Sequence, residues 1–443
     1  MASSRKSTSP DLAQQVAAEL ARHLAPAARR LCVGLSGGLD SVVLLDILAT
    51  LRSRLGFHLT ALHVHHGLSP NADAWARHAA AVADRLGVPC TVERVRVVDI
   101  AALGVEAAAR AARYAVFERC AADALCLAHH RDDQAETLLF NLLRGAGPAG
   151  LAAMPASRPL GDLQLLRPLL DVPRDALLSH ARARALDWVE DESNADPRYD
   201  RNFLRHQVMP LLRERFPGCD AALARTAGHA AEAAQLLIAQ AEQDLPQCLN
   251  GSGGFSLAQA APLGVPRGRH ALRHWLRSQG IVPDERAFEE LWRQGDAAPD
   301  AMPLWRWRGQ RLRCYRRTWY PVHPRAAGPT TPVSWLEGAA QPVASWGGVL
   351  EWLPMPGGLD GARLAGGQLS LRRRQGGEGL CVHPGHGTRP LKSLYQEASI
   401  APWLREALPL LYLDDVLIAV PGLGVATEYR TASGWQPVWR ALP

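Results

Sequence analysis

The stretch Leu31–Ser41, LCVGLSGGLDS, constrains the fold of this chain more than any other. It reads as a short apolar strand, a loop with paired glycines, and the start of an apolar helix. The N–H groups that open a helix have no partner within it, so this order of elements makes an anion site. Gly37 and Gly38 lack a β-carbon and let a phosphate approach the backbone, while Ser36 and Ser41 add hydroxyl donors.

Asp40 is the unusual residue of this loop. A carboxylate repels phosphates unless a divalent cation lies between them, so we expect Asp40 to face Mg²⁺. The loop also lacks the lysine of the GxxxxGK[ST] motif. The alternative is an ordinary turn rich in glycine and serine. We expect six residues to bind the phosphate groups of a ligand: Ser36, Gly37, Gly38, Leu39, Asp40 and Ser41.

Composition narrows the class of protein. A chain of 443 residues suggests roughly two to four domains. The net charge of +6 weakly favours a polyanionic partner. The eight cysteines form no CxxC pair, which argues against a zinc ribbon, an iron–sulfur cluster or a disulfide scaffold. No apolar run could cross a membrane, and the N-terminus lacks the apolar core of a secretion signal, so we expect a cytoplasmic protein.

Strands and helices alternate in the first third of the chain, which predicts an α/β domain with a parallel sheet. Ligands of such sheets bind beyond the carboxyl ends of the strands. The loop at 36–41 and the histidines at 63–66 and 129–130 should therefore share one edge. The expected strands are 57–66, 90–97 and 124–128, and the expected helices are 11–30, 72–86 and 106–122.

Three domains are expected. Residues 1–220 would form the catalytic α/β domain, and 221–345 a mainly helical substrate-binding domain with a strand-like stretch at 303–320. Residues 365–443, with short β-like runs and turn signals, would form a small α+β domain. Lysine is nearly absent, which we interpret as a bias towards arginine codons, and Lys392 is the one lysine in an interior segment.

A second signal is the acidic segment 127–145, LAHHRDDQAETLLFNLLRG. Helical spacing sets Asp133, Glu136 and Thr137 along one side, near the predicted sheet edge. Carboxylates there could bind a cation or accept a proton from an incoming amine. The alternative is that Asp132 and Asp133 only stabilise the start of the helix.

Two pairs of arginines have helical spacing. Arg110 and Arg113 are three residues apart, and Arg201 and Arg205 are four apart. Guanidinium forks suit phosphate or carboxylate groups. An ordinary solvated helix face would show the same spacing, so the pattern by itself leaves both interpretations open.

Taken together, the motifs are specific. SGGLDS, HVHHGL, EAAARAARY, AHHRDDQAET, LLRGAGPAGLAAM, RPLL and WVEDESN…YDRNFLR follow one another over about residues 30–217. This set resembles the tRNA(Ile)-lysidine synthase family, within the ATP pyrophosphatase (PP-loop) superfamily. The segment from LRRRQGGEGL to AVPGLGV resembles that family's terminal domain, whereas residues 225–345 match only loosely.

The resemblance implies an ATP-dependent ligase that attaches L-lysine to the cytidine at the first anticodon position of a CAU-anticodon isoleucine tRNA. It implies ATP and Mg²⁺, catalytic roles for Asp40, Asp133, Glu136 and Arg113, and a possible homodimer without a membrane partner. The residues that it implies for binding tRNA or the activated substrate are Arg110, Arg201, Asn202, Arg205, Arg372, Arg374, Lys392 and Arg405.

The chain departs from the family pattern at His65, where HVDHGL usually has an acidic residue. A metal site at His63, His65 and His66 is disfavoured, because neighbouring strand residues point to opposite faces. Two other functions compete. A tRNA thiolase would need a sulfur carrier, commonly a reactive cysteine or a CxxC cluster, and a non-catalytic RNA-binding protein would not need intact Asp40, Asp133 and Glu136.

Overall fold

The computed structural model describes residues 11–192, 198, 200–251, 253–298, 301–322, 328–385, 387–398 and 400–441. Three residues of the predicted motifs, Ser193, Asn194 and Tyr199, lie outside these ranges. The chain forms two compact units, Met1–Leu236 and Leu237–Pro443.

A six-stranded sheet with the order β3-β2-β1-β4-β6-β5 forms the centre of the first unit. Five strands are parallel, as predicted, and β5 pairs antiparallel with β6 in a hairpin that the sequence reading did not predict. The strands are β1 (Arg30–Gly34), β2 (His58–His65), β3 (Cys90–Arg94), β4 (Ala124–Cys126), β5 (Ser157–Leu160) and β6 (Leu163–Leu166).

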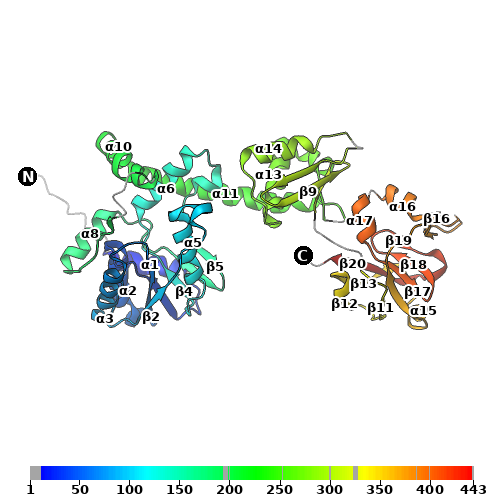
Figure 1. Ribbon diagram of the computed structural model, residues 1–443, viewed down its shortest axis with the longest axis horizontal. Coiled ribbons are helices and arrows are strands. Elements are labelled where there is room, and N and C mark those ends of the chain that lie inside the picture. The colour runs from blue at the N-terminus through cyan, green and yellow to red at the C-terminus, as the bar shows by residue number, and fades with distance from the viewer. Residues whose placement is uncertain are drawn as a thin grey trace, which may run out of the picture. The chain divides into compact units, whose positions relative to one another are not determined.

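Helices cover both faces of this sheet (Figure 1). On one face α1, α2, α3 and α8 share a core with β1 and β2, and on the other α5 packs against β1, β4 and the β5–β6 hairpin. The helices are α1 (Leu12–His23), α2 (Leu39–Leu55), α3 (Ala72–Arg85), α4 (Ile100–Leu103), α5 (Val105–Phe117), α6 (Arg131–Leu143), α7 (Pro148–Leu151), α8 (Arg174–Ala183), α9 (Asp200–Phe203), the π-helical turn η2 (Leu204–Val208) and α10 (Met209–Arg215).

Helix α2 is central because most of its residues are buried. All residues from Val42 to Leu48 are buried, and all of them are apolar except Asp46, which pairs with His180 and Arg184. The helix ends at Gly56, whose φ of 69° is a left-handed conformation that glycine adopts without strain. This packing fixes the position of the loop that precedes α2.

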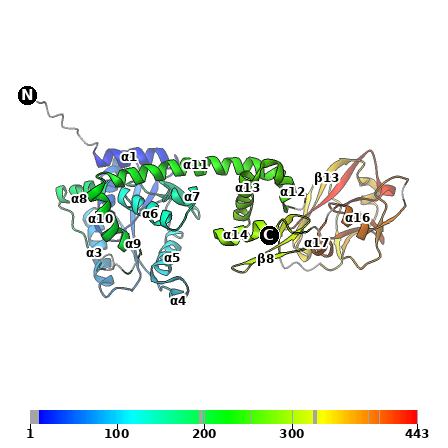
Figure 2. The same cartoon turned by 90° about the horizontal axis from the view of Figure 1, so that it is seen from above.

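The long helix α11 (Cys219–Cys248) runs from the first unit into the second (Figure 2). Beyond it, an antiparallel sheet with the order β7-β10-β9-β8 packs with α13 and α14 around the buried Trp275, Trp305 and Trp319. The predicted strand region at 303–320 is therefore confirmed. The elements are β7 (Phe255–Ser256), α12 (Leu257–Ala260), η3 (Ala261–Leu263), α13 (Val265–Ser278), α14 (Glu285–Gln294), β8 (Leu304–Trp307), β9 (Gln310–Tyr315) and β10 (Thr318–Pro321).

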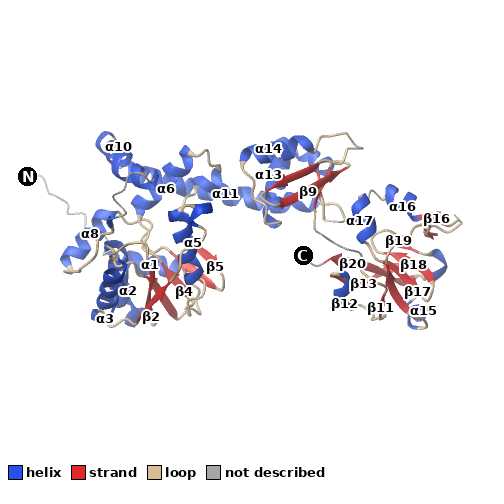
Figure 3. Ribbon diagram, viewed as in Figure 1, coloured by secondary structure: helices blue, strands red, loops and turns tan. Residues whose placement is uncertain are grey.

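The last part of the chain is dominated by antiparallel strands (Figure 3). Its sheets are β11-β14-β17-β18-β19, β12-β13-β20 and β15-β16. They comprise β11 (Thr331–Val333), β12 (Ala340–Val343), η4 (Ala344–Trp346), β13 (Gly348–Pro356), α15 (Gly361–Ala365), β14 (Leu369–Arg372), β15 (Gly379–Leu380), β16 (Arg389–Pro390), α16 (Leu391–Glu397), α17 (Pro402–Ala407), β17 (Leu410–Leu413), β18 (Val416–Val420), β19 (Gly424–Val425), η5 (Thr427–Tyr429) and β20 (Ser433–Ala441).

Strand pairing shows that the C-terminal sheets include residues before 365. β11 pairs with β14, and β13 pairs along its whole length with β20. Residues 331–356 therefore share a core with residues 369–441. The expected domain bounds, 221–345 and 365–443, would divide this core between two domains. We place the start of the C-terminal domain before β11. In the described part of the chain, no helix is long and apolar enough to cross a membrane.

Candidate active site

The loop between β1 and α2 is closed by its own serines. The hydroxyls of Ser36 and Ser41 lie 3.0 Å apart, and Ser41 Oγ donates to the carbonyl of Gly38 at 2.9 Å. The N–H of Gly37 donates to Ser41 Oγ at 3.2 Å. Helix α2 begins at Leu39, so Ser41 lies in its first turn, and Gly38 caps the helix without a side chain. The remaining N–H groups of this turn are available to an anion.

Gly37 also holds the loop to the segment that follows α8. Its φ is 89°, and its carbonyl accepts a hydrogen bond from Val189 N at 3.0 Å. A β-carbon at this position would lie 3.3 Å from Val189 Cγ2. Glycine is therefore required both by the backbone conformation and by this close approach.

The acidic helix α6 begins at the neighbouring strand end, after β4. The Asp133 side chain accepts a hydrogen bond from the N–H of His130 at 3.1 Å, so it does cap the helix. It has a second role too. His130 Nε2 lies 3.4 Å from Asp133 Oδ2 and 3.6 Å from Asp40 Oδ2. This buried imidazole thus joins the phosphate-binding loop to the acidic helix.

The charge of His130 follows from its neighbours. Burial by itself lowers the pKa of His130, but the neighbouring carboxylates of Asp40, Asp133 and Asp132 outweigh it, so the net pKa is raised. Burial by itself raises the pKa of Asp133, but the charges of His130, His129 and Arg205 outweigh burial, so the net pKa is lowered. This carboxyl is therefore ionised at neutral pH.

Arg205 is the second link within the site. Its guanidinium donates to Asp133 Oδ1 at 2.7 Å and to both carboxylate oxygens of Glu136, at 2.7 and 2.8 Å. Arg201, one turn earlier, donates to Thr137 Oγ1 at 2.8 Å. The predicted helix face of Arg201 and Arg205 therefore faces α6. Asn202, between them, is partly buried and has an interaction of its own.

The arginines of α5 lie beside the ends of β2 and β4. Arg110 stacks over the ring of Tyr114 at 4.9 Å. Burial and the charge of Arg113 lower the pKa of His66 to about 4. Burial, with Arg167, Arg110 and Arg113, lowers the pKa of His129 to about 3, against the opposing charge of Asp133. Both histidines are therefore neutral at neutral pH, and Arg113 is half-buried next to them.

The histidines of β2 have structural partners. His63 Nδ1 donates to the carbonyl of Leu35 at 2.8 Å. His65 Nε2 lies 3.1 Å from Asp73 Oδ1, which also accepts from Arg94 at 2.6 Å. Nowhere in the described residues do three His, Cys, Asp or Glu side chains form a group that could hold a metal ion.

Four predicted tRNA-binding residues lie in the second unit. Lys392 is exposed, and Arg372 forms a hydrogen-bonded ion pair with Asp415 at 3.1 Å. Arg374 lies 3.8 Å from Glu378. The expectation that Arg405 faces tRNA needs correction. Arg405 is buried, and its guanidinium donates to the carbonyl of Ile400 at 2.8 Å. A buried guanidinium that is already paired holds the domain together and is not presented to RNA.

Three side chains of this site were missed as functional residues by sequence reasoning. Besides His130, Arg167 donates to His129 Nδ1 at 3.2 Å, and Arg213 pairs with Asp132 at 3.1 Å. The signal for His130 was present, because it lies between a buried strand, β4, and the start of helix α6. Arg167 and Arg213 had none, since they reach the site from distant segments.

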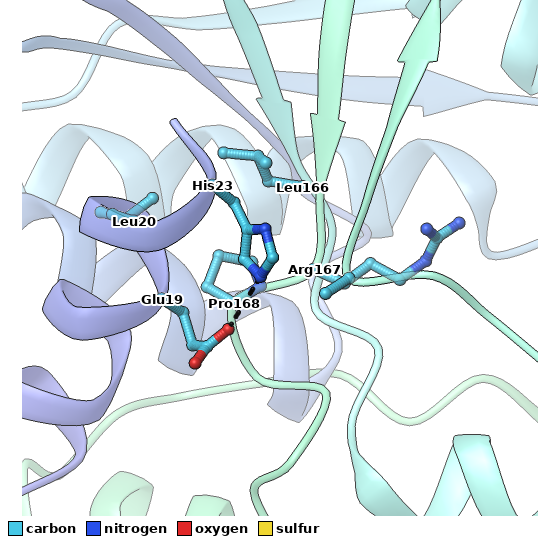
Figure 4. A pocket seen from close by; sticks show the side chains of 7 residues that line it. Glu19, Leu20, His23, Leu166, Arg167 and Pro168 are labelled. Atoms are coloured by element: carbon cyan, nitrogen blue, oxygen red, sulfur yellow. Dashed lines mark ion pairs between the residues drawn. The ribbon is translucent and has the colours of Figure 1, made fainter. Parts of the chain in front are cut away.

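A separate pocket lies between α1 and the segment after β6 (Figure 4). The side chains of His23 and Glu19, one turn apart on α1, pair with each other at 3.4 Å on one wall of it. The guanidinium of Arg167 points away from it, towards His129. None of the predicted site residues lines this pocket, so we assign it to the packing of α1.

Comparisons with known proteins identify the family of this chain. Family models match a PP-loop domain over residues 10–212, a TilS substrate binding domain over 255–320 and a TilS substrate C-terminal domain over 369–440. The tRNA(Ile)-lysidine synthase of Chromobacterium violaceum is 44% identical, covering 92% of this chain and 94% of the relative. The chain belongs to the tRNA(Ile)-lysidine synthase family. The synthases of Pseudomonas aeruginosa and Ralstonia nicotianae are 43% and 42% identical, over 92% and 97% of this chain and 92% and 96% of their own lengths.

Membership of the tRNA(Ile)-lysidine synthase family confirms the resemblance drawn from the motifs. It makes the chain an ATP-dependent enzyme of tRNA modification with a PP-loop domain.

Proposed function

We propose that this chain joins L-lysine to C2 of the cytidine at the first position of a CAU anticodon in an isoleucine tRNA, with ATP as co-substrate. One observation supports this proposal most directly. His130 Nε2 lies 3.6 Å from Asp40 Oδ2 and 3.4 Å from Asp133 Oδ2, so the ATP loop and the carboxylates of α6 are close together. ATP and tRNA are cytoplasmic substrates, so we place the reaction in the cytoplasm.

In the first step, the cytidine 2-oxo oxygen attacks the α-phosphorus of ATP, and pyrophosphate leaves. The N-terminal turn of α2 would hold the pyrophosphate. In the second step, the ε-amine of lysine attacks C2, and AMP takes the C–O electron pair. Because the 2-oxo group alone is a poor leaving group, adenylation has to come first.

The lysine must lose a proton, since its ammonium group has a pKa of about 10.4 in water. Asp133 is our candidate for the base, because it is ionised and contacts His130, the imidazole that also lies beside Asp40 of the loop. Arg205 donates to both carboxylate oxygens of Glu136, and the negative charge of Glu136 would attract the ammonium group of the lysine. The half-buried Arg113 would face the phosphate or the activated base.

The residues present fit a magnesium ion bound together with ATP. Asp40 Oδ1 is buried and has no hydrogen-bond partner among the described residues, and carboxylate oxygens are ligands that Mg²⁺ prefers. Mg²⁺ needs only one or two protein carboxylates when phosphates supply the other oxygens. It would neutralise charge on the departing pyrophosphate.

The deciding experiment incubates the protein with labelled lysine, ATP and single tRNA species, and identifies the modified nucleoside by mass. We expect lysine on the CAU-anticodon isoleucine tRNA only. Asp133→Asn should remove product while ATP binding and folding persist, because the amide keeps the shape but accepts no proton. Turnover by Asp133→Asn would remove it as the base, and sulfur in the product would indicate a thiolase instead.

A further inference from the structure

Two arginines lie directly opposite each other on neighbouring strands of the second unit. Arg306 of β8 is the Cα partner of Arg311 of β9, and both side chains are exposed. Like charges in this arrangement destabilise an antiparallel pair. In the part of the chain that the structure describes, neither guanidinium has an ion-pair partner.

The surrounding hairpin is strongly basic. The segment 304–317, LWRWRGQRLRCYRR, contains six arginines and no acidic residue. Because side chains alternate along a strand, Arg306, Arg311 and Arg313 share one face of the sheet. The other face turns Trp305 and Leu312 into the core. The arginines thus form a row on the open face.

One end of this face is covered from within the chain. Trp403 of α17 packs edge-on against Tyr315 and Tyr320, with ring centres 6.1 and 5.9 Å apart, and Arg313 lies 5.3 Å from its ring. Arg405 donates to the hydroxyl of Tyr315 at 3.4 Å. This contact leaves the end with Arg306 and Arg311 uncovered.

We propose that this open end of the β8–β9 hairpin binds the sugar–phosphate backbone of the tRNA, with Arg306 and Arg311 each donating to phosphate oxygens. A phosphate between the two guanidinium groups turns their repulsion into two charge-assisted contacts. Contacts of this kind fix the position of the RNA and carry no sequence information. The inference rests on the proposed function for its choice of polyanion.

The test uses the full-length double variant Arg306→Gln/Arg311→Gln and measures tRNA affinity from 50 to 300 mM salt. Losing two phosphate contacts should weaken binding about tenfold or more and reduce the slope of log K against log salt by roughly 1.4–1.8. The loss should be equal for isoleucine tRNA and for unrelated tRNAs. At saturating tRNA, kcat and the KM for ATP should stay at wild-type values.

The matched control is Arg277→Gln/Arg286→Gln, which removes two exposed arginines from α13 and α14 and so makes the same change in net charge. We expect it to retain the wild-type salt slope. The melting temperature of the hairpin variant should be unchanged or higher, because a like-charge pair is removed.

The proposal is overturned if the hairpin variant keeps the wild-type salt slope, or if the control variant loses as much affinity. It is also overturned if the hairpin variant binds tRNA normally but loses binding to polyglutamate, which would indicate an acidic protein partner. Failure of the proposed function is a different result: the wild-type protein would then form no lysine adduct on any tRNA.

Discussion

Arg205 offers the sharpest test of how the candidate site is held together. It ties Asp133 and Glu136 of α6 to the segment that follows α9, through three hydrogen bonds of 2.7–2.8 Å. The side chain of Glu136 is only 4% exposed, so it cannot regain water easily if its partner is removed. The substitution Arg205→Met keeps most of the apolar stem and removes the charge.

The expected cost follows from burial. Removing one partner of a fully buried ion pair costs about 3–5 kcal/mol, because a charge is left uncompensated. Arg205 is 36% exposed, so water screens the pair and can replace part of the guanidinium. We therefore expect a loss of about 2–3 kcal/mol. This corresponds to roughly 30- to 150-fold in an opening equilibrium.

The assay is amide hydrogen exchange followed by mass spectrometry on peptides that cover α6. It reports local stability, which a single unfolding transition of a multidomain chain does not give. Arg201→Met is the matched control: it removes an arginine one turn away whose partner is the neutral Thr137 hydroxyl, and should cost about 1 kcal/mol. The double variant Arg205→Met/Glu136→Gln removes the stranded charge and should recover about 1 kcal/mol or more.

Two results would refute this reasoning. One is exchange in Arg205→Met that stays within about threefold of the Arg201→Met control. The other is a double variant that is no more protected than Arg205→Met, since the cost would then not come from the unpaired carboxylate of Glu136.

Two further predictions concern α2. Gly37→Ala puts a β-carbon at a φ of 89° beside Val189, so ATP affinity should fall about tenfold or more in isothermal titration; Gly56→Ala, at a φ of 69° with nothing within 4 Å, should lower the melting temperature but keep ATP affinity. Asp46, 2% exposed, accepts hydrogen bonds from His180 at 2.9 Å and Arg184 at 3.1 Å. Burial by itself raises the pKa of Asp46, but the hydrogen bonds and charges of His180 and Arg184 outweigh burial, so the net pKa is below its ordinary value. Its ionised form therefore adds stability above about pH 4, which is lost as the pH falls through the lowered pKa. The wild type should melt above Asp46→Asn at pH 6, and the gap should close towards pH 3; a gap that is constant with pH would contradict this.

Local patterns predicted the N-terminal domain well because its elements are long or apolar. The strands expected at 57–66 and 90–97 occur at 58–65 and 90–94, and the apolar run after Asp40 forms α2. The β5–β6 hairpin was missed because each strand has four residues, too few to show a period. The expected division near 345–365 separates strands that pair in the structure, because β11 and β13 pair with strands more than 35 residues later.

The sequence by itself determined the chemistry of the loop. Glycines and serines between a strand and a helix indicate a phosphate site, since this property belongs to neighbouring residues, whereas Mg²⁺ at Asp40 stays a prediction. Which distant side chains complete the site was decided only by the tertiary structure. Arg205 meets Glu136 across 69 positions, and His130 meets Asp40 because β1 and β4 are adjacent in the sheet. The same applies to Arg405, whose helical segment gave no sign that packing would bury its charge. Such pairings depend on which elements become neighbours, and that depends on burial across the whole domain.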